Sequence, residues 1–423
     1  MSQLLDTQVD TESARAARIR SPLARPPFLR IWLGLVCSRI GDALTTVALI
    51  WFVLQLTGSG VAIGLVVLCF QLPAIISSPL MGISLDRYQP RLVMAVDNFG
   101  RAGIIAAIPL LYLVGALQLW MVYALALCAG MLSPATEVGL KTISPQLVAD
   151  AELERANALC AISWDVSTLV GPALAGFLIV FLRAPFVLLV DTLTFVVMGV
   201  MVLALPCMQR DVGEPVRDGR RAWSLLGFGV LFRMRRVLLL SAMTLLFLFI
   251  QGLTEVALPV YSQKTLGSGS AGYGLLMTAF SLGSLLALAV ISQRWMSSRY
   301  QGVALAIIVL LSGLFLAPLI VIRTIPVALL FMGLVGLAAA PYFVVEQSIT
   351  QRMVPEQMRG QIFGARGALN VAGYPLGGIF GGVLVGALGV PWAFSTAVLL
   401  CLGMGAISLA APPIRGLRRP GAS

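Results

Sequence analysis

The sequence predicts an all-α membrane protein whose twelve transmembrane helices form two six-helix bundles. The chain of 423 residues is 59% hydrophobic and only 11% charged, whereas soluble domains carry roughly 25% charged residues. Its apolar residues form runs of about 20, which is the length that a helix needs to cross a bilayer. The longest hydrophilic break, from Gln209 to Arg221, divides these runs into six and six.

The twelve expected spans are helices, because an open sheet would leave backbone groups unpaired in lipid. Their limits are 30–56, 61–82, 92–114, 118–140, 158–181, 185–206, 237–262, 271–292, 302–321, 326–349, 361–387 and 391–411. The expected domains are a cytoplasmic tail (1–27), a first six-helix bundle (28–207), a cytoplasmic linker (208–236), a second bundle (237–412) and a cytoplasmic tail (413–423).

Positive charge predicts the orientation of the spans. If the N-terminus lies in the cytoplasm, the inner tails and loops hold 23 of the 29 Lys and Arg residues, and the outer loops hold only Arg183, Lys264 and Arg323. Because cytoplasmic loops are enriched in these residues, both termini are expected inside. The linker stretch AWSLLGFGVLF (222–232) lies between two basic clusters and is expected to lie on the inner membrane surface as an amphipathic helix.

The decapeptide GISLDRYQPR (82–91) places one acid and two bases between two long apolar runs. Gly82 and Pro90 are expected to allow a short reversal there. The decapeptide resembles the loop between spans 2 and 3 of the major facilitator superfamily, usually written G-x-L-A-D-R-x-G-R-R/K. The residues that match this motif are Gly82, Asp86, Arg87 and Arg91.

Three further stretches resemble the bacterial exporters of this superfamily that include the enterobactin exporter and the macrolide efflux proteins. They are SRIGDALTTVALIWFVLQLTGS (38–59), LVADAELERANAL (147–159) and VPEQMRGQ (354–361). The loops before spans 5 and 11 also echo each other at an offset of about 200 residues, as in transporters built from repeats. The resemblance implies a monomeric, multi-pass secondary transporter of the major facilitator fold in the bacterial cytoplasmic (inner) membrane.

The resemblance also implies a role for the decapeptide as a conformational latch that holds the two halves together on the cytoplasmic side. Asp86 would lie near the start of span 11, where unpaired N–H groups favour an anion. Arg87 and Arg91 would pair with acids at nearby helix ends, for which Glu137 is a candidate. The alternative is a positively charged anchor loop, which leaves Asp86 unexplained.

Span 5 contains STLVGPALAG (167–176), which is similar to the antiporter pattern G-x-x-x-G-P-x-x-G-G and favours export. The residues carried over are Ser167, Gly171, Pro172 and Gly176. Small residues allow two helices to approach closely, and a proline inside a helix bends it. The alternative interpretation is plain helix packing.

Asp42 is the leading candidate for proton coupling. It lies about 12 residues into the first span, or roughly 18 Å along a helix, near the midplane where transporter sites lie. Arg39 is three residues earlier on the same helix face, and is expected to hold Asp42 ionised until the contact is lost. The alternative is a structural ion pair within the bundle.

Other charges inside the spans are expected to face an aqueous cavity or one another, because each costs at least roughly 2.5–3.5 kcal/mol at the bilayer centre. The pair of Asp97 and Arg101 at i, i+4 is expected to be structural. The superfamily resemblance places Glu255, with Gln251, on a cavity-lining span, where it could meet a cationic cargo. The remaining intramembrane candidates are Glu137 and Glu346 as gate contacts, Arg366 with Asn370 as partners of Asp86 or cargo, and Asp165 and Asp191 as structural acids.

Several function classes are disfavoured by what the sequence lacks. It contains no His, and its six cysteines are scattered, so neither a metal site nor a disulfide framework is expected. No G-x-x-x-x-G-K-[ST] or G-x-S-x-G stretch occurs, which disfavours ATP as the energy source and a membrane enzyme as the function. The Lys and Arg residues behind the net charge of +11 lie mainly in the expected cytoplasmic tails and loops, so binding of nucleic acid is not expected. No cofactor is expected either.

The leading hypothesis is a proton-coupled exporter of a small amphiphilic molecule, either a drug or antibiotic or a siderophore, that works by alternating access. Its expected partners are this cargo, protons and the lipid bilayer. An importer or a lipid flippase on the same fold is the alternative. A channel is disfavoured, because two echoing halves suit alternating access better than a pore.

Overall fold

The computed structural model of the chain describes residues 22–205, 225–287, 301–355 and 358–410, apart from the side chains of scattered helical residues. Within these ranges the regular elements are helices and no strand occurs, which confirms the all-α prediction. Eleven helical segments of the described residues are long and apolar enough to cross a membrane. The predicted span 271–292 corresponds to α12 (Gly269–Leu286), after which description stops at Ala287 and resumes at Gln301.

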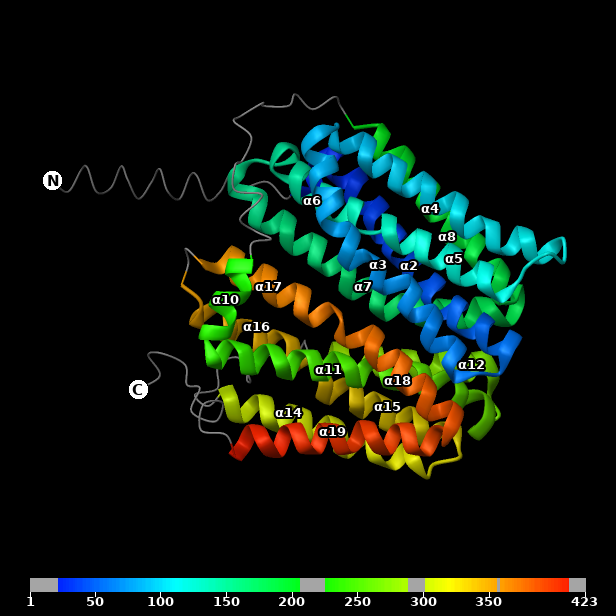
Figure 1. Cartoon of the computed structure of the whole chain (residues 1–423). Helices are drawn as coiled ribbons and strands as arrows, with labels where there is room; N and C mark the ends of the chain where they lie inside the picture. Colours follow the sequence, from blue (N-terminus) through cyan, green and yellow to red (C-terminus); the bar gives the residue numbers. More distant parts are fainter. Residues whose placement is uncertain (1–21, 206–224, 288–300, 356–357, 411–423) are drawn as a thin grey trace.

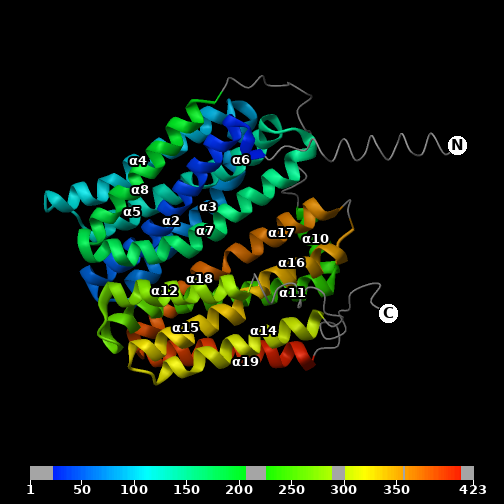
Figure 2. The same ribbon diagram turned by 180° about the vertical axis from the view of Figure 1, so that it is seen from behind.

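The helices form two bundles that lie side by side (Figures 1 and 2). The first contains α2 (Pro26–Thr57), α3 (Gly60–Arg87), α4 (Pro90–Leu113), α5 (Leu119–Leu132), α6 (Pro134–Leu147), α7 (Asp150–Leu182) and α8 (Ala184–Leu203). The second contains α11 (Arg235–Val260), α12, α14 (Gln301–Leu316), α15 (Ile325–Ala339), α16 (Pro341–Met353), α17 (Arg359–Val371), α18 (Gly373–Ala387) and α19 (Val390–Ala410).

Three of the predicted spans are each divided into two helices. The chain passes from α5 to α6 at Pro134 and from α15 to α16 at Pro341. Proline interrupts a helix because it lacks an N–H donor, but it fits well in the first turn of the next helix. The third division, between α17 and α18, falls at Ala372.

The decapeptide 82–91 is more helical than its composition predicts. α3 continues to Arg87, and only Tyr88 and Gln89 separate it from α4, which begins at Pro90. The prediction that Gly82 belongs to the reversal is therefore wrong. A single glycine costs an exposed helix only about 1 kcal/mol, whereas Pro90 is well placed to start the next helix.

The predicted amphipathic helix of the linker is present in part as α10 (Leu225–Arg233). Its Leu231 is fully buried, in a small cluster with Val237, Val354 and Ile362. α10 thus packs beside α17 at one end of the second bundle (Figure 1). Residues 222–224 lie outside the described ranges, and the contact with the membrane surface stays a prediction.

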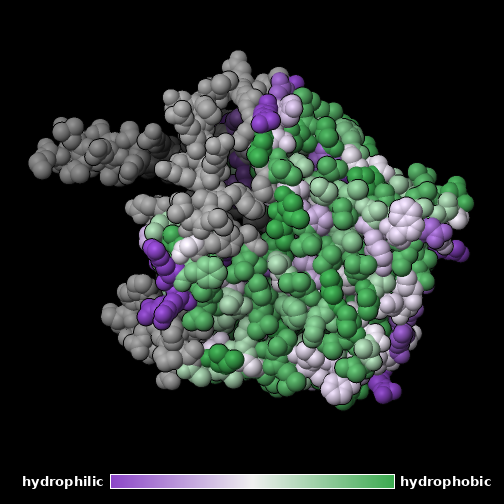
Figure 3. All heavy atoms as spheres, in the orientation of Figure 1, coloured by the Kyte–Doolittle hydropathy of each residue, from purple (hydrophilic) through white to green (hydrophobic). Residues whose placement is uncertain are grey.

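The molecule has two ends that the charge pattern distinguishes. We call the end with the connections 88–89 and 148–149 the inner end, because the charges predict that it faces the cytoplasm. The opposite end, with the connections 58–59 and 388–389, is the outer end. On the face shown in Figure 3, hydrophobic side chains cover the middle and hydrophilic ones gather towards both ends, as expected for a surface surrounded by lipid.

Near the outer end the two bundles meet along an interface rich in glycine. We call it the outer seam and define it by Gly60, Gly64 and Gly176 of the first bundle and Gly274, Gly378 and Gly382 of the second. A Cβ atom on Gly60 would lie 2.9 Å from the Gly382 carbonyl oxygen, and one on Gly64 would lie 2.5 Å from that of Gly378. The close approach of α3 to α18 therefore requires glycine at these positions.

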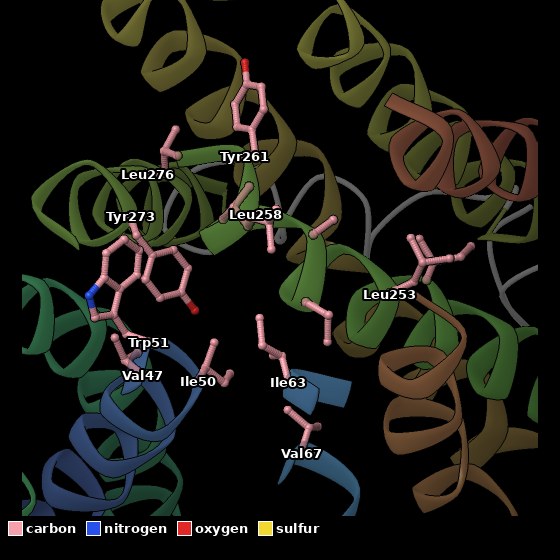
Figure 4. Close-up of a cluster of buried hydrophobic side chains, with 14 of the residues drawn as sticks. Val47, Ile50, Trp51, Ile63, Val67, Leu253, Leu258, Tyr261, Tyr273 and Leu276 are labelled. Atoms are coloured by element: carbon pink, nitrogen blue, oxygen red, sulfur yellow. The ribbon is translucent and has the colours of Figure 1, made fainter. Parts of the chain in front are cut away.

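A buried aromatic and aliphatic core continues across the outer seam. The rings of Trp51 on α2 and Tyr273 on α12 are stacked, with their centroids 6.3 Å apart and their planes at 15° (Figure 4). Ile50 and Ile63 of the first bundle face Leu258 of the second in the same close-up. These side chains are at most 3% exposed, so the contact between the bundles is closed at this level.

Candidate functional site

A cavity of about 1090 Å³ lies between the bundles, on the inner side of the outer seam. Its aromatic lining residues are Phe70, Trp164, Phe280 and Phe363, and its charged lining residues are Arg39, Asp42, Arg101, Glu137, Lys141 and Glu255. Pockets for drug-sized molecules commonly measure roughly 300–1,000 Å³ and combine apolar walls with a few polar groups. The cavity therefore has the size and the chemistry to hold an amphiphilic molecule.

Asp42 of α2 lies in the cavity wall, and its ion-pair partner is Arg101 of α4. The Arg101 side chain is only 5% exposed, whereas 35% of the Asp42 side chain is exposed. Arg101 also lies 4.1 Å from the centre of the Phe195 ring of α8. The predicted pair of Asp42 with Arg39 is therefore wrong, since the guanidinium that binds Asp42 comes from another helix.

Arg39 is held by α6 and α7. It donates hydrogen bonds to Glu137 Oε1 at 2.5 Å, and to the Cys160 carbonyl and the Ser163 hydroxyl at 2.6 Å each. Its guanidinium lies 5.3 Å from the centre of the Trp164 ring. Spacing along one helix places side chains on one face, but acceptors on neighbouring helices decide where a long side chain binds.

Asp97 of α4 is buried and binds α6. Its Oδ2 atom accepts hydrogen bonds from the hydroxyl of Thr136 and from its backbone N–H, the latter at 3.1 Å. Thr136 lies in the first turn of α6, where free N–H groups favour a carboxylate. The predicted ion pair of Asp97 with Arg101 is therefore not formed, because α6 supplies the donors and Arg101 binds Asp42.

Asp191 of α8 is completely buried against α2. Its Oδ2 atom accepts a hydrogen bond from the Thr45 hydroxyl at 2.5 Å, and its Oδ1 atom lies 2.9 Å from Thr194 Oγ1. Gly41 makes room for this group, because a Cβ there would overlap the side chains of Asp191 and Thr194. The sequence predicted Asp191 to be a structural acid but did not predict its hydrogen-bond partners.

Glu255 of α11 lines the cavity from the second bundle, as predicted. Its carboxylate interacts with the Tyr374 hydroxyl of α18, and no ion pair involves it within the described residues. Gln251, one turn earlier, is half-buried and is absent from the described cavity lining. Of this predicted pair, the structure thus brings only Glu255 into contact with the cavity.

The second bundle contains a buried ion pair away from the cavity. Arg366 of α17 pairs with Glu346 of α16 and donates to the Thr244 hydroxyl at 3.3 Å. Neither charged residue lines the cavity, so the predicted contact of Arg366 with cargo does not agree with its position. The Oδ1 atom of Asn370 is buried and has no hydrogen-bond partner within the described residues.

The predicted latch is described only in part. Arg91 donates hydrogen bonds to Gln89 Oε1 at 3.1 Å and to the Leu205 carbonyl at 3.4 Å. The predicted pair of Arg91 with Glu137 is wrong, because Glu137 binds Arg39 of α2. The Asp86 side chain lies outside the described part of the chain, as does that of Asp165, so the latch role of Asp86 stays a prediction.

The four motif residues of span 5 lie on α7 and divide between two surfaces. Ser167 and Pro172 line the cavity. Gly171 packs against Ala43 of α2, and Gly176 packs against the backbone of Gly274 at the outer seam. The motif therefore contacts the second bundle as well as its own.

Sequence reasoning missed the outer seam and the aromatic residue beside Arg39. The seam has a signal in the sequence, because Gly60 and Gly64 are four residues apart, as are Gly378 and Gly382. Small residues at this spacing favour close helix contacts in membranes. Trp164 has no comparable signal, because its role depends on the packing of α7 against α2.

Comparison with known proteins supports a common fold and family. The model of the Major Facilitator Superfamily matches residues 31–302 and 256–422 of the chain. The chain is 27% identical to the multidrug efflux pump Tap of Mycolicibacterium fortuitum, over 93% of this chain and 97% of that protein. It is 22% identical to macrolide efflux protein A of Streptococcus pyogenes, over 93% of this chain and 96% of that protein.

Solved structures share the fold at low sequence identity. The nucleoside transporter NupG matches with a TM-score of 0.69 and 17% identity, over 90% of this chain and 97% of that one. An inward-facing bacterial homologue of the iron transporter ferroportin matches with a TM-score of 0.69 and 16% identity, over 91% of this chain and 98% of that one.

Proposed function

Because the chain belongs to the major facilitator superfamily, a family of transporters and not of enzymes, we propose that it exports a small amphiphilic organic molecule in exchange for protons. The observation that carries the proposal is the cavity, whose aromatic walls also present the acids Asp42 and Glu255. The two efflux relatives support export, and their names favour a drug or antibiotic as cargo over a siderophore.

The proposed mechanism is alternating access. In this structure the bundles meet at the outer seam, and the cavity lies on its inner side. With the orientation that the charges predict, cargo enters the cavity from the cytoplasm or the inner leaflet. Parting of the outer seam would then open the cavity to the outside. A proton bound at Asp42 would favour one of these states only as far as the two states differ in proton affinity.

Accumulation of labelled cargo in intact cells tests the proposed function. Cells that make the protein should accumulate less of a drug or dye that it carries than cells without the gene, and a protonophore should remove the difference. The probes are ethidium and a macrolide, because both combine a large apolar surface with positive charge. Higher accumulation in the expressing cells, abolished by the protonophore, would show an importer and contradict the proposal.

Glu255→Gln should weaken the export of cationic cargo selectively. Glu255 is the acid on the second-bundle side of the cavity, and a hydrogen bond to a charged group contributes roughly 1.5–3 kcal/mol. We expect the apparent affinity for ethidium to fall by about tenfold or more, and that for an uncharged drug to change little. Glu255→Asp, which keeps the charge, is the matched control. Equal losses for charged and uncharged cargo would rule out an ionic contact.

A further inference from the structure

The interior of the first bundle holds more acid than base. Asp42, Asp97 and Asp191 come from three different helices, and each interacts electrostatically with the buried guanidinium of Arg101. Arg39, the other buried arginine described in this bundle, is compensated by its ion pair with Glu137. If all three carboxyl groups were ionised, the cluster would carry two uncompensated negative charges. An isolated buried charge is so costly that the group usually becomes neutral instead. At least one of the three acids should therefore hold a proton.

Asp42 and Asp97 both have the surroundings of an anion. Asp42 binds Arg101 directly and is partly exposed to the cavity. Asp97 accepts two hydrogen bonds from Thr136, one of them from a first-turn N–H of α6, where the helix dipole stabilises negative charge. The donors at Asp42 and at Asp97 Oδ2 favour the ionised form of these two acids, although Asp97 Oδ1 is buried without a hydrogen-bond partner within the described residues.

Asp191 has the surroundings of a neutral acid. It is completely buried, and its hydrogen-bond partners are the hydroxyl groups of Thr45 and Thr194. Thr194 Oγ1 lies 2.8 Å from the Asp191 backbone carbonyl and 2.9 Å from Oδ1, but a hydroxyl group has only one hydrogen to donate. If that hydrogen goes to the backbone, as is common for helical threonine, the contact with Oδ1 requires a proton on the carboxyl group.

The charged groups that face Asp191 come from two helices. α2 contributes Asp42 and α4 contributes Arg101, which also interacts with Asp97 of its own helix. Arg101 lies against the ring of Phe195, which is four residues after Asp191 and so on the same face of α8. The Arg101 Nε atom is buried and has no hydrogen-bond partner within the described residues. The guanidinium thus has an unused donor and lies beside the helix that carries Asp191.

We propose that Asp191 is a second proton site, which holds a proton while Arg101 is paired with Asp42 and loses it when Arg101 turns to Asp191. The exchange conserves charge, because neutral Asp191 and ionised Asp42 become ionised Asp191 and neutral Asp42. The Arg101 guanidinium moves from Asp42 to Asp191 in the same step. One O–H bond breaks at Asp191 and one forms at Asp42, from which the cavity can take the proton. This role rests on the proposed proton-coupled export.

Infrared spectroscopy of the full-length protein in lipid tests the protonation of Asp191 without any transport. At neutral pH the wild type should show the carbonyl stretch of a protonated carboxylic acid, identified by its shift on ¹³C-labelling of aspartate. Asp191→Asn should abolish the band, and the matched variant Asp97→Asn should retain it. Thr194→Val removes only the hydroxyl that faces Oδ1 and should shift the band without abolishing it. A band that survives in Asp191→Asn overturns the proposal.

Transport by Asp191→Asn tests the coupling role. The amide imitates the neutral acid, so cargo exchange across vesicles without a pH gradient should persist. Gradient-driven accumulation should fall by about tenfold or more, because the coupling between proton and cargo is lost. Gradient-driven transport at the wild-type rate would overturn the proposal. If even the wild type shows no gradient-driven transport, the proposed function fails, whereas the infrared result still decides where the proton lies.

Discussion

Gly176→Leu should abolish most transport while leaving both bundles folded. A Cβ atom on Gly176 would overlap the Cα atom of Gly274 and lie 3.0 Å from its backbone nitrogen. The clash is therefore with backbone atoms, which cannot move away by a change of rotamer. Overpacking of this kind costs roughly 1–3 kcal/mol or more. The penalty applies only to the state with a closed outer seam, and we expect that state to become about 10- to 100-fold less populated.

The distance between the two bundles at the outer end is the direct measurement. Spin labels at Val114 and Val321, which are exposed on opposite bundles, should move apart in Gly176→Leu, and cargo efflux should fall in parallel. Gly103→Leu is the matched control, because nothing lies within 4 Å of a Cβ at that exposed position of α4.

The same variant separates the two interpretations of the span-5 motif. If Gly176 serves only plain helix packing, Gly176→Leu should lower the midpoint of thermal unfolding and leave the label distance unchanged in the folded fraction. If it serves closure between the bundles, unfolding should stay near that of the wild type and the label distance should increase.

Apolar length and charge were enough to predict the helices. A run of about 20 apolar residues has few alternatives to a transmembrane helix. The divisions at Pro134 and Pro341 were visible in the sequence as prolines, but a proline can bend a helix or end it. Which of the two occurs depends on whether neighbouring helices supply partners for the freed backbone groups.

The acids of the cavity were easier to predict than their partners. Asp42 and Glu255 were found because an ionisable residue in an apolar run is costly in the membrane and so indicates a functional site. Arg101 was assigned to Asp97 on its own helix, yet it binds Asp42. Arginine has a long side chain with five donors, so its choice among acids depends on the distances between helices. A single sequence does not contain those distances.

Glu346→Leu should destabilise the second bundle strongly. Glu346 and Arg366 are 2% and 6% exposed, and Glu346 also accepts a hydrogen bond from Thr350 at 2.9 Å. Removing one partner of a buried ion pair leaves the other charge uncompensated and typically costs about 3–5 kcal/mol. We expect a large fall in the midpoint of thermal unfolding in detergent, followed by tryptophan fluorescence.

The double variant Glu346→Leu with Arg366→Leu decides whether the uncompensated charge is the cause. Replacing both partners of a buried pair by apolar residues is often neutral or stabilising, so the double variant should unfold closer to the wild type than Glu346→Leu alone. Arg25→Leu gives a comparison at a half-buried pair, because 43% of the Arg25 side chain is exposed but only 5% of that of Glu152, so it should cost less than Glu346→Leu. Since neither Glu346 nor Arg366 lines the cavity, the folded double variant should bind cargo with wild-type affinity. A double variant less stable than Glu346→Leu, or one that folds but does not bind cargo, would show that the pair does more than neutralise charge.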